Sequence, residues 1–272
     1  MVDFAYNLAI ETSSRQGAIA LGRGDQMLCA IDLPTPRRHR VDLMPSIADL
    51  CDKHQIKPAD IGEIYVSIGP GSFTGLRIAV TTAKVISMIT GAKIIAVPTL
   101  DVVAQNVQPS DDLLAVALNH KNKTVYGGLY QHDGSHWSLI SKPNVQNLEQ
   151  LLNSPTPGSS PENFSGCDHE IGNVISGGRK IQLLGEALPP EVFPELGENF
   201  RGGGSQNSSC DELVVLDSAL AKPQAKFVWQ IGQRLASDPQ DTDAYALVPL
   251  YAREPEAVKL WEQNKNKRVN CA

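Results

Sequence analysis

The chain contains the stretch Ser67-Ile68-Gly69-Pro70-Gly71-Ser72-Phe73-Thr74-Gly75-Leu76-Arg77 between an apolar run ending at Val66 and a helix-like segment at 78–90. This layout predicts a strand, a glycine turn and a helix. Glycines at three positions in seven allow positive φ angles and close approach by another group. A serine or threonine here can cap the helix, and the first N–H groups of a helix favour an anion. Residues 69–75, called the glycine motif below, therefore suggest a phosphate site.

The spacing of the glycine motif fits neither standard phosphate loop. It reads G-x-G-x-x-x-G, whereas the dinucleotide fingerprint is G-x-G-x-x-G, and no lysine follows Gly75 before Lys84. The main interpretation is therefore that the glycine motif positions the helix that follows it for docking. An anion or nucleotide contact is a secondary interpretation. The residues expected to make such a contact are Gly69, Gly71, Ser72, Thr74 and Gly75.

The composition indicates a soluble globular protein. The chain has 272 residues, of which 42% are hydrophobic and 20% charged, and its formal net charge is −6. This length allows one large domain or two lobes with a substantial core. An acidic chain is a poor candidate for binding nucleic acid by itself, because phosphate neutralisation needs clustered Lys and Arg. The local exception, 36–40, contains three arginines and is interpreted as a solvated turn before a helix.

The cysteines and the N-terminal residues indicate a cytoplasmic protein. Five scattered cysteines include no C-x-x-C pair, so neither a zinc site nor a disulfide framework is indicated. Residues 1–6 lack the basic and apolar regions of a signal peptide. No apolar run is expected to span a membrane.

The pattern of the chain predicts two successive α/β units. Strands in the first are expected as an antiparallel meander and then as two further strands, with helices between and after them. The second unit repeats strands followed by a helix. The expected strands are 6–11, 17–21, 27–33, 63–68, 93–97, 113–118, 125–130, 137–141 and 171–176; the expected helices are 42–54, 78–90, 100–107, 181–184 and 218–236.

Polar or glycine-rich segments separate the later elements. Residues 153–169 form a proline-rich loop, and 201–210 contain a second flexible segment. The glycine pair at 177–178 is interpreted as a plain turn, with contact to an adenine or ribose as the alternative.

Two helices are apolar over an unusually wide surface. In the helix after the glycine motif, one stripe contains Leu76, Val80 and Ala83, and a second contains Ile78, Val85 and Ile89. A helix that is apolar almost all round is buried on more than one side. The neighbouring helix at 42–54 is similarly broad, which favours a partner subunit over a large internal core.

The motif at 69–77, together with Leu8-Ala9-Ile10-Glu11-Thr12-Ser13 and Pro249-Leu250-Tyr251-Ala252-Arg253, resembles the bacterial TsaB (YeaZ) family. The resemblance is dense over 8–105, sparse afterwards, and returns at the C-terminus. It implies a two-lobed actin-like, Hsp70-like ATPase (ASKHA) fold, an α/β fold with duplicated lobes. The expected divisions are 1–107 for the N-terminal lobe, 108–220 for the C-terminal lobe, and 221–272 for a helix and tail that pack back on the lobes.

The resemblance also implies the function. Members of the family are non-catalytic partners of a TsaD subunit in synthesis of threonylcarbamoyladenosine at position 37 of tRNAs decoding ANN codons. A TsaE-like ATPase takes part through the complex, a homodimer is the alternative assembly when TsaD is absent, and contact with tRNA is only indirect. The helices at 42–54 and 78–90 would dock TsaD. The interface residues expected there are Leu43, Ile47, Leu50, Arg77, Val80 and Lys84.

No metal site and no resident cofactor are expected. The catalytic relatives hold metal with H-x-x-x-H, but His39 is followed four residues later by Leu43. Glu11 and Thr12 at the first strand's end are interpreted as structural. The alternatives left open are ATP or ADP at the subunit boundary, an ATPase or kinase using the glycine motif, and a peptidase using Ser72 or Thr74.

Overall fold

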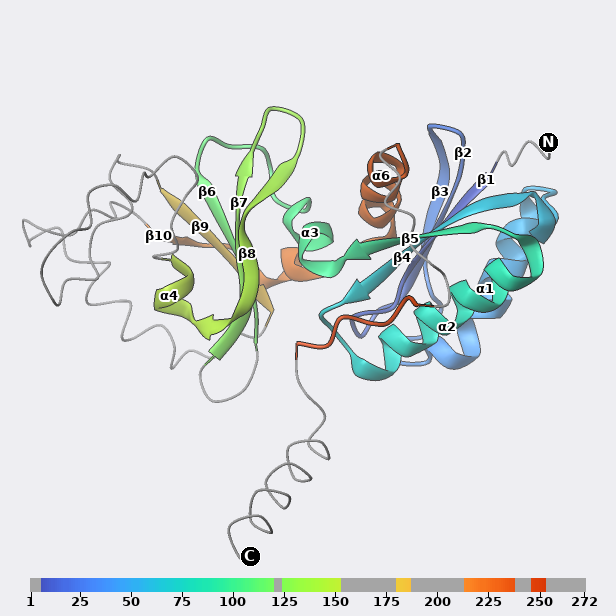
Figure 1. Cartoon of the computed structure of the whole chain (residues 1–272), viewed down its shortest axis with the longest axis horizontal. Coiled ribbons are helices and arrows are strands. Elements are labelled where there is room, and N and C mark those ends of the chain that lie inside the picture. Colours follow the sequence, from blue (N-terminus) through green and yellow to red (C-terminus); the bar gives the residue numbers. More distant parts are fainter. Residues whose placement is uncertain (1–5, 120–123, 153–179, 187–212, 238–245, 253–272) are drawn as a thin grey trace, which may run out of the picture.

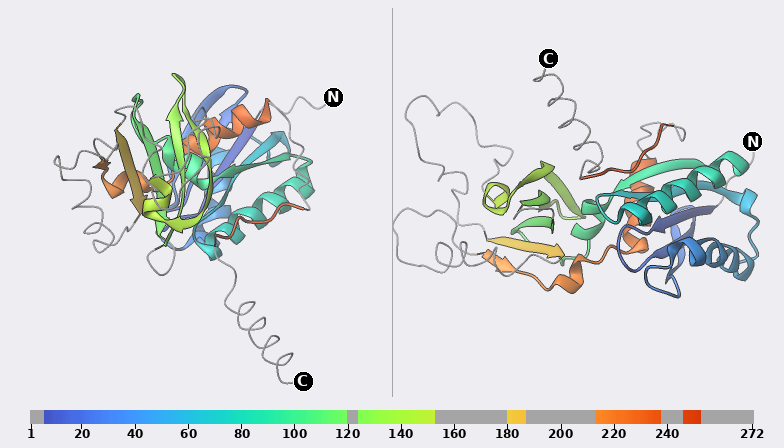
Figure 2. Two further views of the ribbon diagram at one scale, coloured as in Figure 1. Left: turned by 60° about the vertical axis from the view of Figure 1, so that its left-hand side comes forward. Right: turned by 90° about the horizontal axis from the view of Figure 1, so that it is seen from below.

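The computed structural model describes residues 6–119, 124–152, 180–186, 213–237 and 246–252 (Figure 1). Two lobes, each built on a five-stranded mixed sheet, lie side by side (Figures 1 and 2). The first sheet has the order β3-β2-β1-β4-β5, with β1, β2 and β3 antiparallel and β4 and β5 parallel to β1. Its strands are β1 (Tyr6–Glu11), β2 (Ala18–Arg23), β3 (Gln26–Asp32), β4 (Ile61–Gly69) and β5 (Lys93–Pro98).

The second sheet repeats this topology, which confirms the predicted duplication. Its order is β10-β9-β6-β7-β8, in which β6, β7 and β8 form the meander and β9 and β10 run parallel to β6. The strands are β6 (Leu113–Asn119), β7 (Thr124–His132), β8 (Trp137–Asn147), β9 (Ile181–Glu186) and β10 (Leu213–Val215).

The prediction of a helix at 181–184 is wrong, because these residues belong to β9. Ile181 and Leu183 pack in one core cluster, whereas Leu184 packs in another. A strand buried on both faces is apolar at successive positions, and periodicity cannot distinguish it from a short buried helix. The predicted strand at 171–176, the glycine pair at 177–178 and the loops at 153–169 and 201–210 lie outside the described residues.

The helices flank the sheets at bounds that differ from those predicted. The region 218–236 is divided by Pro223, since the residue before a proline favours an extended backbone and Lys222 adopts one. The helices are α1 (His39–Lys53), η1 (Pro58–Asp60), α2 (Phe73–Thr90), α3 (Thr99–Ala104), α4 (Leu148–Leu152), η4 (Ser218–Ala221) and α6 (Ala225–Ala236).

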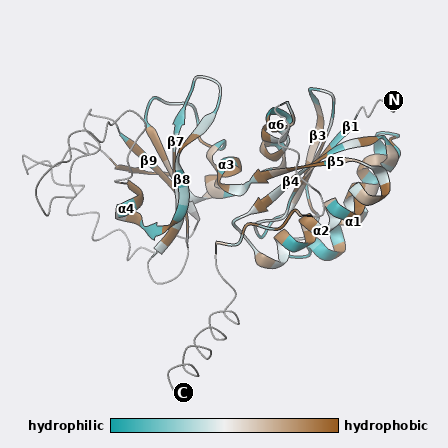
Figure 3. Ribbon diagram, in the orientation of Figure 1, coloured by the Kyte–Doolittle hydropathy of each residue, from teal (hydrophilic) through white to brown (hydrophobic). Residues whose placement is uncertain are grey.

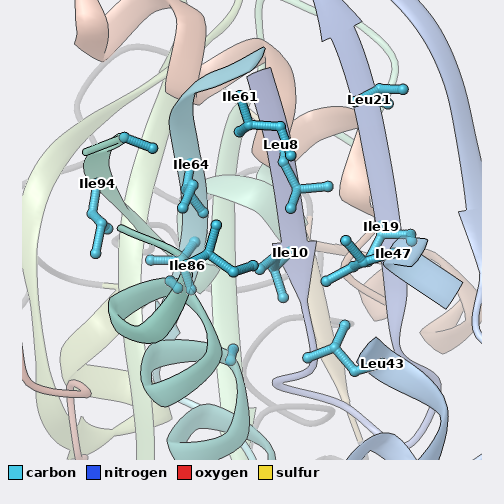
Figure 4. Close-up of a cluster of buried hydrophobic side chains, with 14 of the residues drawn as sticks. Leu8, Ile10, Ile19, Leu21, Leu43, Ile47, Ile61, Ile64, Ile86 and Ile94 are labelled. Atoms are coloured by element: carbon cyan, nitrogen blue, oxygen red, sulfur yellow. The ribbon is translucent and has the colours of Figure 1, made fainter. Parts of the chain in front are cut away.

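The first sheet is covered on both faces. Leu8 and Ile10 of β1 join the cluster formed with α1 and α2, and Figure 4 shows Leu43 and Ile47 of α1 beside these strands. Ala9 points to the other face, where α6 packs. The first sheet therefore forms the middle of three layers, and its central strand is apolar on both sides.

Helix α3 connects the two lobes. Leu100 and Val103 pack with Leu114 and Tyr130 of the second sheet. The Tyr130 hydroxyl donates to the Asp101 carboxylate at 2.8 Å. The connection between the lobes is therefore both packed and hydrogen-bonded.

Helix α6 is fixed to β1 by a buried polar contact as well as by packing. The indole N–H of Trp229 donates to Oδ1 of Asn7 at 2.5 Å, and the Asn7 amide donates to the carbonyl of Gly24 at 3.0 Å. A buried polar group left without its partner costs about 1–3 kcal/mol. This contact therefore specifies the position of α6 on the sheet.

Replacement of Trp229 by alanine should lower the free energy of unfolding by about 3–5 kcal/mol, because it leaves a cavity and removes the Asn7 partner. Urea denaturation followed by circular dichroism measures this change. Gln230→Ala, at an exposed position of the same helix, is the matched control and should stay within about 0.5 kcal/mol of the parent. Equal effects of the two substitutions would contradict the assigned packing of α6.

Candidate functional site

Three segments that are distant in sequence meet where β1 and β4 end and α2 begins. The Ser72 N–H donates to the Ser13 carbonyl at 2.6 Å, and the Leu250 N–H donates to the Ile68 carbonyl at 2.7 Å. The tail at 246–252 lies alongside α2 (Figure 1). The stretches that carried the family resemblance thus form one site.

Two glycines of the motif permit close contact with the turn after β1. A Cβ atom at Gly75 would overlap the carbonyl oxygen of Thr12, and one at Gly71 would lie 2.5 Å from the carbonyl oxygen of Ser13. The Thr12 hydroxyl also donates to the Gly75 carbonyl at 2.8 Å. The chain's own backbone therefore makes the close approach that these two glycines allow.

The tail makes the third contact of the site. Gly69 has a φ of +118°, and a Cβ there would lie 2.5 Å from the carbonyl oxygen of Leu250. The next tail residue, Tyr251, lies 4.9 Å from the Phe73 ring, centroid to centroid, and its hydroxyl accepts from Nε of Arg77 at 3.1 Å. The Arg77 guanidinium lies 4.0 Å from the Phe73 ring centroid. This stack of three side chains was missed by sequence reasoning, since nothing local links 251 to 73.

Ser72 is the N-cap of α2, which confirms one of the two capping residues that the sequence suggested, Ser72 and Thr74. Its side chain accepts from the Gly75 N–H at 3.3 Å, so the helix begins at Phe73, five residues before the predicted start. Thr74 is exposed in the first turn. The C-terminal end of α2 is capped by Gly91 in a left-handed conformation, a common helix ending.

Four of the predicted interface residues are buried in the first lobe, which corrects their assignment to an outer face. Each is 5% exposed or less, because these side chains hold α1 and α2 on the sheet. Arg77 is exposed and Lys84 half-buried, so both lie nearer the surface. The four buried residues are Leu43, Ile47, Leu50 and Val80.

The exposed apolar residues of α1 and α2 form a different surface, called the α1–α2 outer face below. On α2, Val85, Met88 and Ile89 are 46%, 67% and 79% exposed and share one side at i, i+3 and i+4 spacing. On α1, Val41 and Met44 are 48% and 51% exposed. Figure 3 shows hydrophobic positions along both helices. The second stripe noted in the sequence contains Val85 and Ile89, whereas four of the predicted interface residues lie on the buried side of the two helices.

By length and composition alone, α2 is apolar enough to cross a membrane, contrary to the sequence-based expectation. One third of the helix is buried in the lobe. Its Ala79 and Ala83 pack in the core cluster of the first sheet, and its Leu76 is fully buried. Such a helix is weak evidence for a membrane span, since the core helix of a globular domain passes the same test.

Glu11 lies at the end of β1 in a fully buried polar cluster. Its Oε1 accepts from the backbone N–H and the hydroxyl of Ser13, both at 2.5 Å, while Oε2 has no partner among the described residues. Burial raises the pKa of the Glu11 carboxyl, and the hydrogen bonds from Ser13 partly offset this effect. The Ser67 hydroxyl contacts that of Thr99 at 2.8 Å. Glu11 thus holds the turn on which α2 rests.

The histidines within the described residues serve local structure. His39 is buried, and its Nε2 lies 2.9 Å from the Ser14 carbonyl. His132 and His136 flank a turn in which Gly134 has a φ of +97°, as the sequence suggested. Among the described residues, no three His, Cys, Asp or Glu side chains are grouped to hold a metal.

Two mixed sheets of matching topology, each with flanking helices, define the two-lobed actin-like, Hsp70-like ATPase fold. A solved structure from Pseudomonas aeruginosa, described as similar to peptidase YeaZ, has a TM-score of 0.62 and 21% identity, and covers 92% of this chain and 100% of its own. A second, titled YeaZ from the same organism, gives 0.62 and 20%, with coverage of 91% and 99%. These likenesses establish the fold.

The chain belongs to the TsaB family. It is 36% identical to the tRNA threonylcarbamoyladenosine biosynthesis protein TsaB of Bacillus subtilis, over 95% of this chain and 98% of that protein. TsaB of Escherichia coli is 26% identical, with coverage of 69% and 87%. Residues 34–261 also match a family model described as TsaD, tRNA N6-adenosine threonylcarbamoyltransferase. The family suggested by the three sequence motifs is therefore confirmed.

Replacement of Gly75 by alanine should destabilise the protein by roughly 1–3 kcal/mol, although alanine favours helix, because the new Cβ overlaps the Thr12 carbonyl. Urea denaturation measures the change. Thr81→Ala, at an exposed position of the same helix, should be neutral or slightly stabilising. A gain in stability from Gly75→Ala would show that α2 is not seated on this turn.

Glu11→Gln should stabilise the protein more as the pH rises. The folded pKa of Glu11 is raised above its ordinary 4.5, so the parent loses stability from this group as pH increases through the folded value. Glutamine keeps an acceptor for Ser13 and carries no charge. The difference in unfolding free energy between variant and parent, measured by urea denaturation from pH 4 to 8, should grow with pH. A constant difference would contradict the buried position of Glu11.

Proposed function

We propose that this chain is a non-catalytic partner subunit that binds a TsaD subunit in the synthesis of threonylcarbamoyladenosine on tRNA. Its relatives are named for that biosynthesis, and the matching family model describes the transferase TsaD. The observation that carries the proposal is the α1–α2 outer face. On this face, the neighbouring helices α1 and α2 both expose apolar side chains.

The outer face has the properties of a docking surface. Met88 and Ile89 are the most exposed of its side chains, and on α1 Val41 and Met44 are about half exposed. Single apolar residues on a surface are ordinary, whereas three on one side of a helix, as Val85, Met88 and Ile89 are on α2, favour an interaction site. Helical faces of this kind bury their apolar stripe against another helix pair. TsaD, or a second copy of this chain when TsaD is absent, would supply that pair.

The glycine motif supports a structural role over a nucleotide site. Gly71 and Gly75 approach the backbone at 12–13, and Gly69 approaches the tail. The N-terminal helix position that would favour a phosphate is capped by Ser72. ATP or ADP at the boundary with a partner subunit remains a prediction that binding measurements can test.

The contacts at the two predicted nucleophiles, Ser72 and Thr74, do not support the peptidase alternative. The Ser72 hydroxyl accepts the Gly75 N–H as a helix cap, and Thr74 lies exposed in the first turn. The histidine tied to the adjoining turn, His39, is buried with Nε2 at the Ser14 carbonyl. A nucleophile is activated by a hydrogen-bonded base, and none of these contacts supplies one.

A double substitution, Met88→Glu with Ile89→Glu, should weaken binding to the organism's own TsaD at least about tenfold, because charges replace apolar residues in the buried centre of the interface. Affinity is measured by calorimetry with purified proteins. The control Leu139→Glu with Val145→Glu adds the same charge at two exposed apolar residues of β8, which are 42% and 44% exposed, and should leave the affinity unchanged.

Unchanged binding by the Met88 and Ile89 variant would contradict the docking face. Substitutions at Val80 or Ile47 are unsuitable tests because both side chains are buried. The non-catalytic assignment has its own test. Turnover of ATP by the isolated chain, lost in Glu11→Gln, would instead support a kinase or ATPase.

A further inference from the structure

Four arginines gather beside the turn that seats α2. Arg15 lies in the turn between β1 and β2, and its carbonyl accepts the N–H of Arg37 at 2.8 Å. Arg38 is the N-cap of α1, and Arg40 lies in its first turn. All four side chains are exposed. These residues, called the arginine patch below, come from two segments that only the fold brings together.

The positive charge of the arginine patch is not balanced locally. The segments 12–24 and 33–41 contain no Asp or Glu, although the whole chain has a net charge of −6. Glu11 is buried at the other side of the turn, and Asp42 is half-buried in α1. Among the described residues, the ion pairs involve His136 with Asp133 and Lys222 with Asp32, and none includes an arginine of the patch.

The backbone under the patch is held in place by several contacts. Arg37 has a φ of +64°, in the left-handed region that is uncommon for a residue with a side chain. The buried His39 ring lies 2.9 Å from the Ser14 carbonyl, and the Leu33 N–H donates to the Gly17 carbonyl at 2.8 Å. The two segments are therefore fixed to each other, so the guanidinium groups extend from an ordered base.

We propose that the arginine patch binds the phosphate backbone of RNA, with a tRNA as the physiological ligand. This inference rests on the proposed function for the identity of the RNA, while the chemistry follows from the patch itself. Guanidinium groups bind phosphate bidentately, and each neutralised phosphate adds to affinity by releasing counterions. The net charge of −6 made the chain a poor candidate for binding nucleic acid by itself, but net charge averages over the chain and conceals a local cluster.

RNA is favoured over other anionic partners. A membrane-binding surface combines basic residues with apolar ones that enter the lipid. In this protein, the exposed apolar side chains that follow the patch on α1, Val41 and Met44, belong to the α1–α2 outer face assigned to a protein partner. The patch adjoins Val41 and Met44 at the N-terminal end of α1, so a bound TsaD and a bound tRNA would lie side by side.

The test measures binding of the full chain alone to a transcribed tRNA that decodes an ANN codon, by fluorescence anisotropy between 50 and 200 mM salt. Arg15→Gln, Arg37→Gln and Arg40→Gln are combined, and Arg38 is kept because it is the N-cap of α1. This variant should bind roughly tenfold more weakly or worse at 100 mM salt. Its slope of log affinity against log salt should fall by about 2 to 3.

The matched control replaces Lys53, Lys57 and Lys93 by glutamine. These three lysines are exposed at the end of the first sheet that lies opposite the arginine patch. Their replacement removes three positive charges, as the arginine variant does. The control should keep the parent affinity to within about twofold. Because TsaD is not in the assay, a failure of TsaD docking would not affect the outcome.

Equal affinity of the parent and the arginine variant would overturn the proposal, as would equal losses in the variant and the control. Vesicles of phosphatidylserine and phosphatidylcholine form a second arm. Binding to the vesicles without binding to tRNA would also overturn it, and would assign the patch to a membrane. If the combined variant failed to fold, Arg15→Gln alone and the parent's salt slope would decide, since a slope near zero excludes phosphate binding.

Discussion

The contact between Gly75 and Thr12 is the constraint on which the first lobe depends. It brings the first turn of α2 against the end of β1, at a distance that any side chain at 75 would prevent. The Ser72 N–H to Ser13 carbonyl bond fixes the same approach one turn earlier. Because the start of α2 is fixed, its Ala79 and Ala83 lie under the sheet and Met88 and Ile89 face outward. The contact that fixes the start of α2 therefore also determines which side chains form the α1–α2 outer face.

The same turn connects the other parts of the site. Glu11 orders it from within through Ser13, and the arginine patch begins at Arg15 on its outer side. The tail reaches the opposite side of the glycine motif, where Tyr251 orders Arg77. The proposed docking face, the proposed RNA-binding patch and the tail at 246–252 are thus all connected to this turn.

Much of the fold could be predicted from local pattern, but the side of each helix could not. The meanders and the strand before the glycine motif are signalled by apolar runs between turns, and the duplication follows from their order. In α2 both stripes are apolar, so periodicity does not say which faces the sheet. The smaller residues, Ala79 and Ala83, were the available signal, because close packing on a sheet favours them. The meeting of Arg15 with Arg37, and of Tyr251 with Arg77, depends on tertiary contacts that one sequence does not encode locally.

The central claim is that the α1–α2 outer face of this TsaB-family protein receives TsaD. Hydrogen–deuterium exchange of the full chain, with and without the organism's TsaD, tests it most directly because bound surfaces exchange more slowly. The account predicts slower exchange in peptides covering α1 and α2, and unchanged exchange in β7 and β8 of the second lobe. Protection confined to β7 and β8, with α1 and α2 unaffected, would contradict it.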